Sequence, residues 1–124
     1  MIINDPEVRA EVAVIFDIYE AALLANDNAL LTTMFLDSPV AVRYGLNDVQ
    51  HGFGEIVAFR ATQSPFTRKL DHTVITSYGR DCATASTLFI RDDAPGKIGR
   101  QMQTWVRTES GWKVAAAHVS MMDA

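Results

Sequence analysis

The spacing of apolar residues changes at Arg68, and this change limits the chain to a small set of folds. Before Arg68 the apolar residues recur every three or four positions, as in helices, whereas after it they alternate with polar residues, as in strands. Four long strands are expected, over residues 68–78, 82–91, 98–108 and 112–121. Helices followed by a run of antiparallel strands predict an α+β fold in which the helices pack against one face of a curved sheet.

Three helices are predicted in the first half of the chain, over residues 6–25, 29–35 and 55–63. Asp5 has the chemistry of an N-cap, and proline follows it at the first helical position. One face of the first helix carries residues at spacings of three and four, namely Val8, Val12, Ile15, Tyr19 and Ala22. Tyr19 is therefore expected to point inward, where its hydroxyl needs a hydrogen-bond partner, either a backbone carbonyl or a ligand.

The composition is that of a single domain over residues 1–124. Fifteen acidic residues outnumber eleven scattered basic ones and give a net charge of −4, so no nucleic-acid partner is expected. The single cysteine, Cys82, excludes an internal disulfide, and the N-terminus lacks the features of a signal peptide. No apolar run approaches the roughly 20 residues of a membrane span. These features predict a cytoplasmic protein without a membrane partner.

A permanent charge interrupts the short apolar strand expected over residues 37–45, because Arg43 follows Val40, Ala41 and Val42. A buried guanidinium without a partner is costly, so Arg43 needs an anion. Two readings remain open, in which the anion is either a carboxylate of the chain itself or a bound ligand. We favour the ligand, with Tyr19 beside it. A further short strand is expected near His51.

Alternation along the last two strands predicts a set of side chains that face one cavity, namely Gln103, Trp105, His118 and Ser120. Arg60, on the third predicted helix, is a candidate second ligand for an anion. Each of these residues also has a structural interpretation: a solvated strand or helix residue, a core tryptophan, or a histidine satisfied within the fold.

Signatures of covalent or metal-dependent catalysis are missing from the sequence. No serine lies in a Gly-x-Ser-x-Gly setting, and Cys82 has no histidine next to it. His51, His72 and His118 lie far apart and lack second ligands at short range, so neither a metal nor another cofactor is expected.

Several stretches resemble known proteins. Residues 19–27, 35–45 and 111–120 are similar to the SnoaL-like branch of the nuclear transport factor 2-like superfamily. Within that branch, Val42-Arg-Tyr-Gly45, Ala58-Phe-Arg60, residues 73–81 and residues 99–107 resemble the AtzH-like and HpxZ-like proteins. The resemblance covers the whole chain and implies a cone-shaped α+β fold. In that fold three N-terminal helices and a strongly curved antiparallel sheet enclose a pocket, and homodimers commonly form through the outer sheet face.

Ketosteroid isomerase, another member of this superfamily, has a tyrosine where Tyr19 lies, whereas its proton-abstracting aspartate corresponds to Arg43. A guanidinium cannot take a proton from carbon, so the isomerase reaction is not expected.

The resemblance to AtzH-like proteins implies a metal-independent amidohydrolase of nitrogen catabolism. Its implied substrate is a carboxylated urea, either 1,3-dicarboxyurea, converted to allophanate, or an oxalurate-related compound. Tyr19 and Arg43 are the implied catalytic residues, with Arg60, Gln103, Trp105 and His118 as candidate substrate-binding residues. The alternative is a non-catalytic accessory protein that passes such a compound to a partner amidase.

Overall fold

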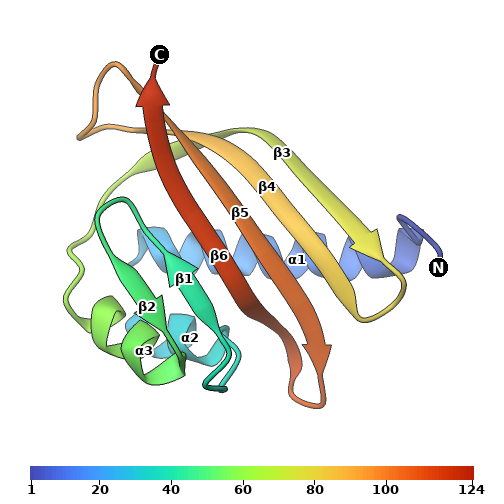
Figure 1. Cartoon of the computed structure of the whole chain (residues 1–124). Coiled ribbons are helices and arrows are strands. Elements are labelled where there is room, and N and C mark those ends of the chain that lie inside the picture. Colours follow the sequence, from blue (N-terminus) through green and yellow to red (C-terminus); the bar gives the residue numbers. More distant parts are fainter.

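Six strands form one sheet in the computed structural model, which describes all of residues 1–124 (Figure 1). Their bounds are β1 Val42–Tyr44, β2 Val49–His51, β3 Arg68–Tyr78, β4 Cys82–Arg91, β5 Lys97–Thr108 and β6 Gly111–Asp123. The order across the sheet is β2-β1-β6-β5-β4-β3. The four long strands lie where the alternating pattern predicts them.

The sheet is mixed and open. β1 pairs with β6 in parallel, whereas all the other neighbouring strands are antiparallel. Because β1 and β6 lie far apart in the chain, no tight turn forces them to run in opposite directions. The predicted α+β class with a curved sheet and N-terminal helices is confirmed. The correction concerns the parallel pair of β1 and β6, since an antiparallel sheet was expected. β2 and β3 form opposite edges and do not meet, so the sheet is not closed.

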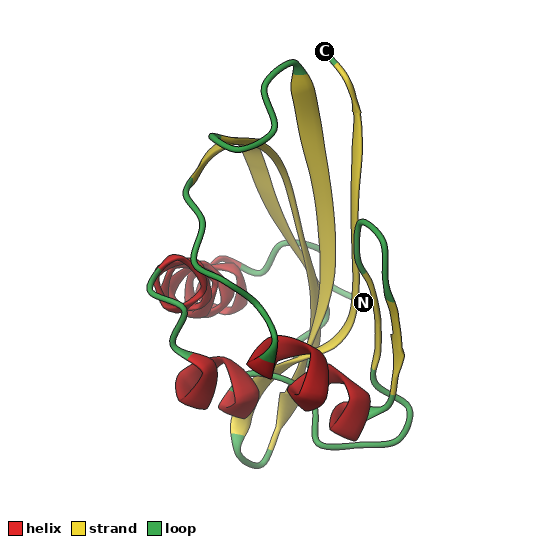
Figure 2. Ribbon diagram, turned by 90° about the vertical axis from the view of Figure 1, so that its left-hand side faces the viewer, coloured by secondary structure: helices red, strands yellow, loops and turns green.

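Three helices lie on one side of the sheet, and the other side carries none (Figure 2). They are α1 Pro6–Leu24, α2 Asn28–Thr33 and α3 Phe53–Ala61. Asp5 caps α1 as predicted, because its carboxylate accepts hydrogen bonds from the backbone N–H groups of Glu7 and Val8 at 3.0 and 3.3 Å. None of the three helices is long and apolar enough to cross a membrane.

The core fills the space between the helices and the concave face of the sheet. The apolar stripe of α1 packs there, with Val8, Val12 and Tyr19 all buried. Trp105 of β5 is fully buried and belongs to the same cluster. This packing fixes α1 against the sheet and so fixes the direction in which Tyr19 points.

A β-bulge in β6 reverses the predicted alternation of its side chains. Trp105 pairs with Val114 and Thr104 pairs with Ala116, which leaves Ala115 as an extra residue. Beyond the bulge, Ala117 and Val119 face the concave side, as their place in the cavity wall shows. The prediction that His118 and Ser120 face the cavity is therefore wrong, because one inserted residue exchanges the two faces of a strand.

Candidate functional site

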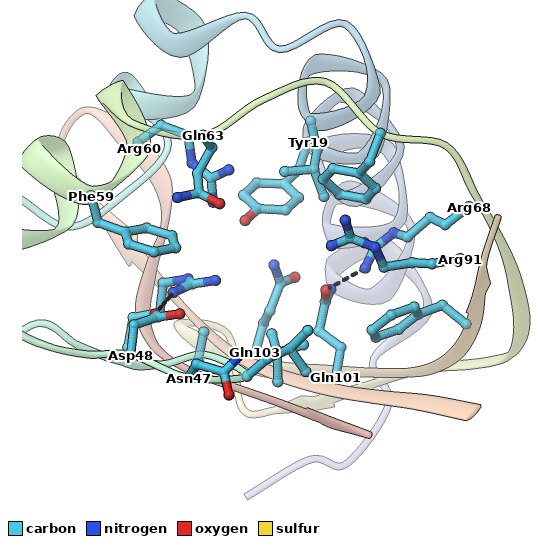
Figure 3. Close-up of a pocket in the computed structure, with 17 residues that line it drawn as sticks. Tyr19, Asn47, Asp48, Phe59, Arg60, Gln63, Arg68, Arg91, Gln101 and Gln103 are labelled. Atoms are coloured by element: carbon cyan, nitrogen blue, oxygen red, sulfur yellow. Dashed lines mark hydrogen bonds and ion pairs between the residues drawn. The ribbon is translucent and has the colours of Figure 1, made fainter. Parts of the chain in front are cut away.

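A cavity of about 180 Å³ opens between α1, α3 and the concave face of the sheet (Figure 3). Arginine and amide side chains supply most of its polar lining. The polar residues are Tyr19, Arg43, Asn47, Asp48, Arg60, Gln63, Arg68, Arg91, Gln101 and Gln103, and the apolar ones are Leu23, Leu46, Phe59, Phe66, Phe89, Ala117 and Val119. The residues come from positions scattered between 19 and 119, so only the folded chain assembles the site.

Tyr19 projects from α1 into this cavity. The residue is only 4% exposed, and its ring makes edge contacts with Trp105 and Phe35, whose ring centroids lie 5.9 and 6.1 Å away. The hydroxyl makes no hydrogen bond to any residue of the chain, so the alternative of a bond to a backbone carbonyl is not realised. Figure 3 shows the phenol oxygen directed toward the side of the cavity where Phe59, Arg60 and Gln63 lie. The hydroxyl is therefore free to meet a ligand.

Arg43 already has an internal carboxylate, contrary to the favoured prediction. Its Nη1 lies 2.7 Å from Asp48 Oδ1 and donates to Gln50 Oε1 at 2.9 Å, and Gln50 Nε2 donates to the same Asp48 oxygen at 3.0 Å. The ring of Phe59 lies 4.4 Å from the guanidinium carbon. The internal ion pair, which was the alternative reading of the sequence, is the one that the structure supports.

The turn between β1 and β2 makes this ion pair possible. Gly45 donates its backbone N–H to the carbonyl of Asp48 at 3.0 Å, which folds the aspartate back over the strand. A Cβ at Gly45 would overlap the side chains of both Asp48 and Arg43. Burial opposes ionisation of Asp48, but the hydrogen bond from Gln50 and the charge of Arg43 outweigh it and lower the pKa of Asp48 below its ordinary value.

Arg60 is the cation without a counterion. It is 6% exposed, it forms no ion pair, and its Nε is buried with no hydrogen-bond partner. Burial lowers the pKa of Arg60 from its ordinary value, and the charge of Arg43 acts in the same direction, while Tyr19 and Asp48 oppose the shift. The interpretation of Arg60 as a solvated helix residue is wrong, because α3 turns it into the cavity. A guanidinium stays protonated, so the charge remains.

The opposite end of the cavity holds two arginines that are both paired. Arg68 donates to the two carboxylate oxygens of Glu20 at 3.0 and 2.5 Å and to Gln101 Oε1 at 3.0 Å. Arg91 forms an ion pair with Asp93 at 2.7 Å. With Arg43 paired to Asp48, three of the four lining arginines are neutralised within the chain. The site as a whole therefore carries one unmatched positive charge, which is that of Arg60.

The remaining candidate residues fall on different sides of the sheet. Gln103 lines the cavity. Trp105 lies behind it, fully buried, and donates from Nε1 to Gln103 Oε1 at 3.0 Å. His118 lies on the outer face, exposed, with its ring 6.2 Å from that of Tyr44. The structure places His118 away from the site and makes Trp105 a support instead of a lining residue.

Three charged residues of the cavity wall, Arg68, Arg91 and Asp48, are not predicted by the sequence patterns. Asp48 had a signal, since it lies five residues beyond Arg43 across an expected turn. Arg68 had none, because its partner Glu20 is 48 positions away. No group of three histidine, cysteine, aspartate or glutamate side chains lies close enough together to hold a metal ion.

Comparison with known proteins gives a consistent result. A model of the AtzH-like family matches residues 1–124. A solved structure from Pectobacterium atrosepticum, described as a protein with unknown function from the DUF3225 family, is 46% identical, with a TM-score of 0.94 over 98% of this chain and 95% of that chain. A cystatin-like fold protein from Burkholderia xenovorans is 44% identical, with a TM-score of 0.96 over 100% of this chain and 98% of that chain.

A more distant structure, a nuclear transport factor 2-like superfamily protein from Salmonella enterica, is 25% identical, with a TM-score of 0.76 over 92% of this chain and 90% of that chain. No curated protein matches the chain. These similarities cover 92% to 100% of this chain, so they include most of the helices and strands that carry the cavity.

Proposed function

Because the chain belongs to the AtzH-like family, we propose that it is an amidohydrolase acting on a carboxylated urea. The substrate is either 1,3-dicarboxyurea, converted to allophanate, or an oxalurate-related compound, and the reaction belongs to nitrogen catabolism. One observation carries the proposal: the buried, unpaired guanidinium of Arg60 faces the same small cavity as the free hydroxyl of Tyr19.

The carboxylate of the substrate binds Arg60 in this proposal. An unpaired buried cation gains most from a bound anion, because the charge-assisted hydrogen bonds replace solvation that burial has removed. Arg43 contributes as a donor of hydrogen bonds, since its Nε and Nη2 make none within the chain, while its charge is balanced by Asp48. A cavity of about 180 Å³ suits a molecule of urea-like size.

Tyr19 supplies the proton. With 1,3-dicarboxyurea, the bond between the urea nitrogen and the carboxyl carbon breaks, the electron pair moves to nitrogen, carbon dioxide leaves, and nitrogen takes the proton of the Tyr19 hydroxyl. The phenolate left behind is stabilised by the positive charge of Arg60, because the two side chains lie close enough in the cavity for their charges to interact. Water then returns the proton to Tyr19. No nucleophilic side chain is needed, because positioning and one proton donor suffice for a labile carbamate bond.

A non-catalytic accessory role is the second candidate. It is favoured by the lack of a free carboxylate to activate water, which hydrolysis of an oxalurate-related compound would need, since the carboxylate of Asp48, the only one in the cavity wall, is held by Arg43 and Gln50. In this alternative the cavity holds the carboxylated urea and delivers it to a partner amidase.

The purified protein alone distinguishes the two candidates. Freshly prepared 1,3-dicarboxyurea and oxalurate are incubated with it, and release of carbon dioxide from the first and breakdown of the second are followed against the spontaneous rates. Release above the spontaneous rate that scales with protein concentration supports the enzyme. Saturable binding without acceleration supports the accessory protein, and neither binding nor acceleration contradicts both.

We also propose that the protein is a homodimer that buries the outer face of the sheet. This face has no helix over it (Figure 2), and it exposes Val74, Ile90, Met102 and Met122. Exposed apolar side chains gathered on one face favour association. Sedimentation equilibrium of the protein and of Met102→Glu tests the dimer, which the added charge is expected to weaken. A monomeric parent protein contradicts it.

A further inference from the structure

Gln101 and Gln103 lie next to each other on the concave face of β5, and the side-chain carbonyl oxygen of each accepts a hydrogen bond from another residue of the protein. Gln103 Oε1 accepts a hydrogen bond from Trp105 Nε1 at 3.0 Å. Gln101 Oε1 accepts one from Arg68 Nη1 at 3.0 Å. The two residues alternate with outward-facing Met102, so both amides lie on the floor of the cavity.

The chemistry of the donors fixes the orientation of each amide. An indole N–H and a guanidinium can only donate hydrogen bonds, so the amide atom that faces them must be the oxygen. A flipped amide would bring two donors together and leave a buried N–H without a partner. The amino groups must therefore occupy the other positions on the amides of Gln101 and Gln103.

Those amino groups have no acceptor in the protein. Gln101 Nε2 is buried without a hydrogen-bond partner, and Gln103 Nε2 likewise makes no hydrogen bond within the chain, although Gln103 is only 2% exposed. Figure 3 shows Gln103 rising from the floor into the middle of the cavity, between the side where Phe59 and Arg60 lie and the side where Arg68 and Arg91 lie. An unpaired donor in such a place is available to an acceptor on a ligand.

We propose that Trp105 and Gln103 form a subsite that selects a neutral carbonyl oxygen, with Trp105 as the positioning residue and Gln103 Nε2 as the donor. The inference rests on the proposed function for the class of ligand, because a carboxylated urea carries a carbonyl next to its carboxylated nitrogen. Arg60 binds the acid group, and the amide of Gln103 binds the urea carbonyl. Without the indole, the amide of Gln103 could rotate and present its oxygen, which would repel the same carbonyl.

Two stable dicarboxylates test this subsite without any turnover. 2-Oxoglutarate has a ketone where glutarate has a methylene group, and the two molecules have the same length and charge. Calorimetric titration of the intact protein is expected to give about fivefold tighter binding of 2-oxoglutarate, the effect of one neutral hydrogen bond. Equal affinities of the two dicarboxylates would overturn the proposal.

Gln103→Glu isolates the amino group. The glutamate keeps an oxygen for Trp105 and replaces the donor with a second acceptor, so the preference for the ketone is expected to disappear. Gln63→Glu is the matched control, since Gln63 also lines the cavity and receives the same change of charge. It is expected to weaken both dicarboxylates while keeping the preference. A preference retained in Gln103→Glu contradicts the assignment of the donor.

Trp105→Phe tests the positioning role. It removes the indole N–H from a fully buried site, and the preference for the ketone is expected to fall at least threefold while glutarate binds as before. If this variant fails to fold, Gln103→Met, which removes both the oxygen and the amino group of the amide, shows whether the preference for the ketone depends on Gln103. If the protein does not turn over ureas but still prefers the ketone, the proposed function is wrong and the subsite is supported. If it turns over ureas without preferring the ketone, the proposed function is supported and the subsite is wrong.

Discussion

Arg43 and Arg60 reach the same cavity from two regions of the molecule, but they differ in what they need. Both guanidinium groups lie near the ring of Phe59, at 4.4 and 5.7 Å from its centroid. The hairpin of β1 and β2 gives Arg43 a carboxylate partner, whereas α3 gives Arg60 none. A cavity arginine that already has a carboxylate partner does not need an anionic ligand, whereas one without a partner does. Arg60 is the arginine without a partner here.

Replacing Arg60 with methionine is expected to have the largest effect of all the variants on the binding of carboxylates. Loss of the unmatched charge should weaken binding of carboxylates by about 100-fold or more, since an ionic hydrogen-bonded contact is lost. The free energy of unfolding should stay the same or rise by about 1 kcal/mol, because a buried charge without a partner is removed. Titration calorimetry and chemical denaturation measure the two effects. Strong destabilisation together with unchanged binding would assign Arg60 a purely structural role.

Tyr19→Phe is expected to have the next largest effect, on turnover instead of binding. The ring contacts with Trp105 and Phe35 remain, whereas the proton donor is lost, so the rate should fall by about 100-fold. Binding of carboxylates should change by less than about fivefold, the worth of one hydrogen bond. Steady-state kinetics with a carboxylated urea measures the rate. Full turnover by this variant would exclude Tyr19 as the donor.

Asp48→Asn should make Arg43 resemble Arg60. With its counterion gone, Arg43 becomes a second unmatched cation, so binding of carboxylates is expected to tighten by about threefold to tenfold. The free energy of unfolding should fall by about 1 kcal/mol in the absence of ligand, since Asp48 is partly exposed and its ion pair is partly screened. Glu20→Gln provides a comparison at the opposite end of the cavity. Weaker binding in Asp48→Asn would contradict the account of Arg43.

The pH dependence of stability gives the smallest effect. The pKa of Asp48 is lowered in the folded state, because Gln50 and Arg43 outweigh the opposing effect of burial. Its stabilising contribution is therefore fully present above the ordinary aspartate pKa and is lost as pH falls through the lowered folded value. The difference in unfolding free energy between the parent protein and Asp48→Asn should be constant near neutral pH and shrink below about pH 4. A difference that grows on acidification would contradict the lowered pKa.

The sequence predicts the fold better than it predicts the site. The long strands and the inward direction of Tyr19 follow from local periodicity, which a buried face imposes on each helix and strand. The bulge at Ala115 has no such signal, because a run of three alanines fits either face of the sheet, and His118 was misplaced for that reason. The pairing of Arg68 with Glu20 depends on how α1 packs on the sheet.

Whether Arg43 or Arg60 is free to bind a ligand depends on Asp48, which the sequence places near Arg43. Asp48 lies five residues after Arg43, in the turn that joins the short antiparallel strands β1 and β2, and its carboxylate can therefore reach Arg43. Arg60 has no acidic residue three or four positions away in the chain, where Ile56, Val57, Gln63 and Ser64 stand. The lack of a nearby acidic residue therefore predicts a ligand-binding arginine better than the interruption of an apolar run does.

A crystal structure of the protein with bound oxalurate tests the central claim most directly. The account predicts the carboxylate within hydrogen-bond distance of the Arg60 guanidinium, with the Tyr19 hydroxyl against the ureido group and the ion pair of Arg43 and Asp48 intact. A carboxylate bound to Arg68 or Arg91 with Arg60 untouched, or oxalurate bound outside the cavity, would contradict it.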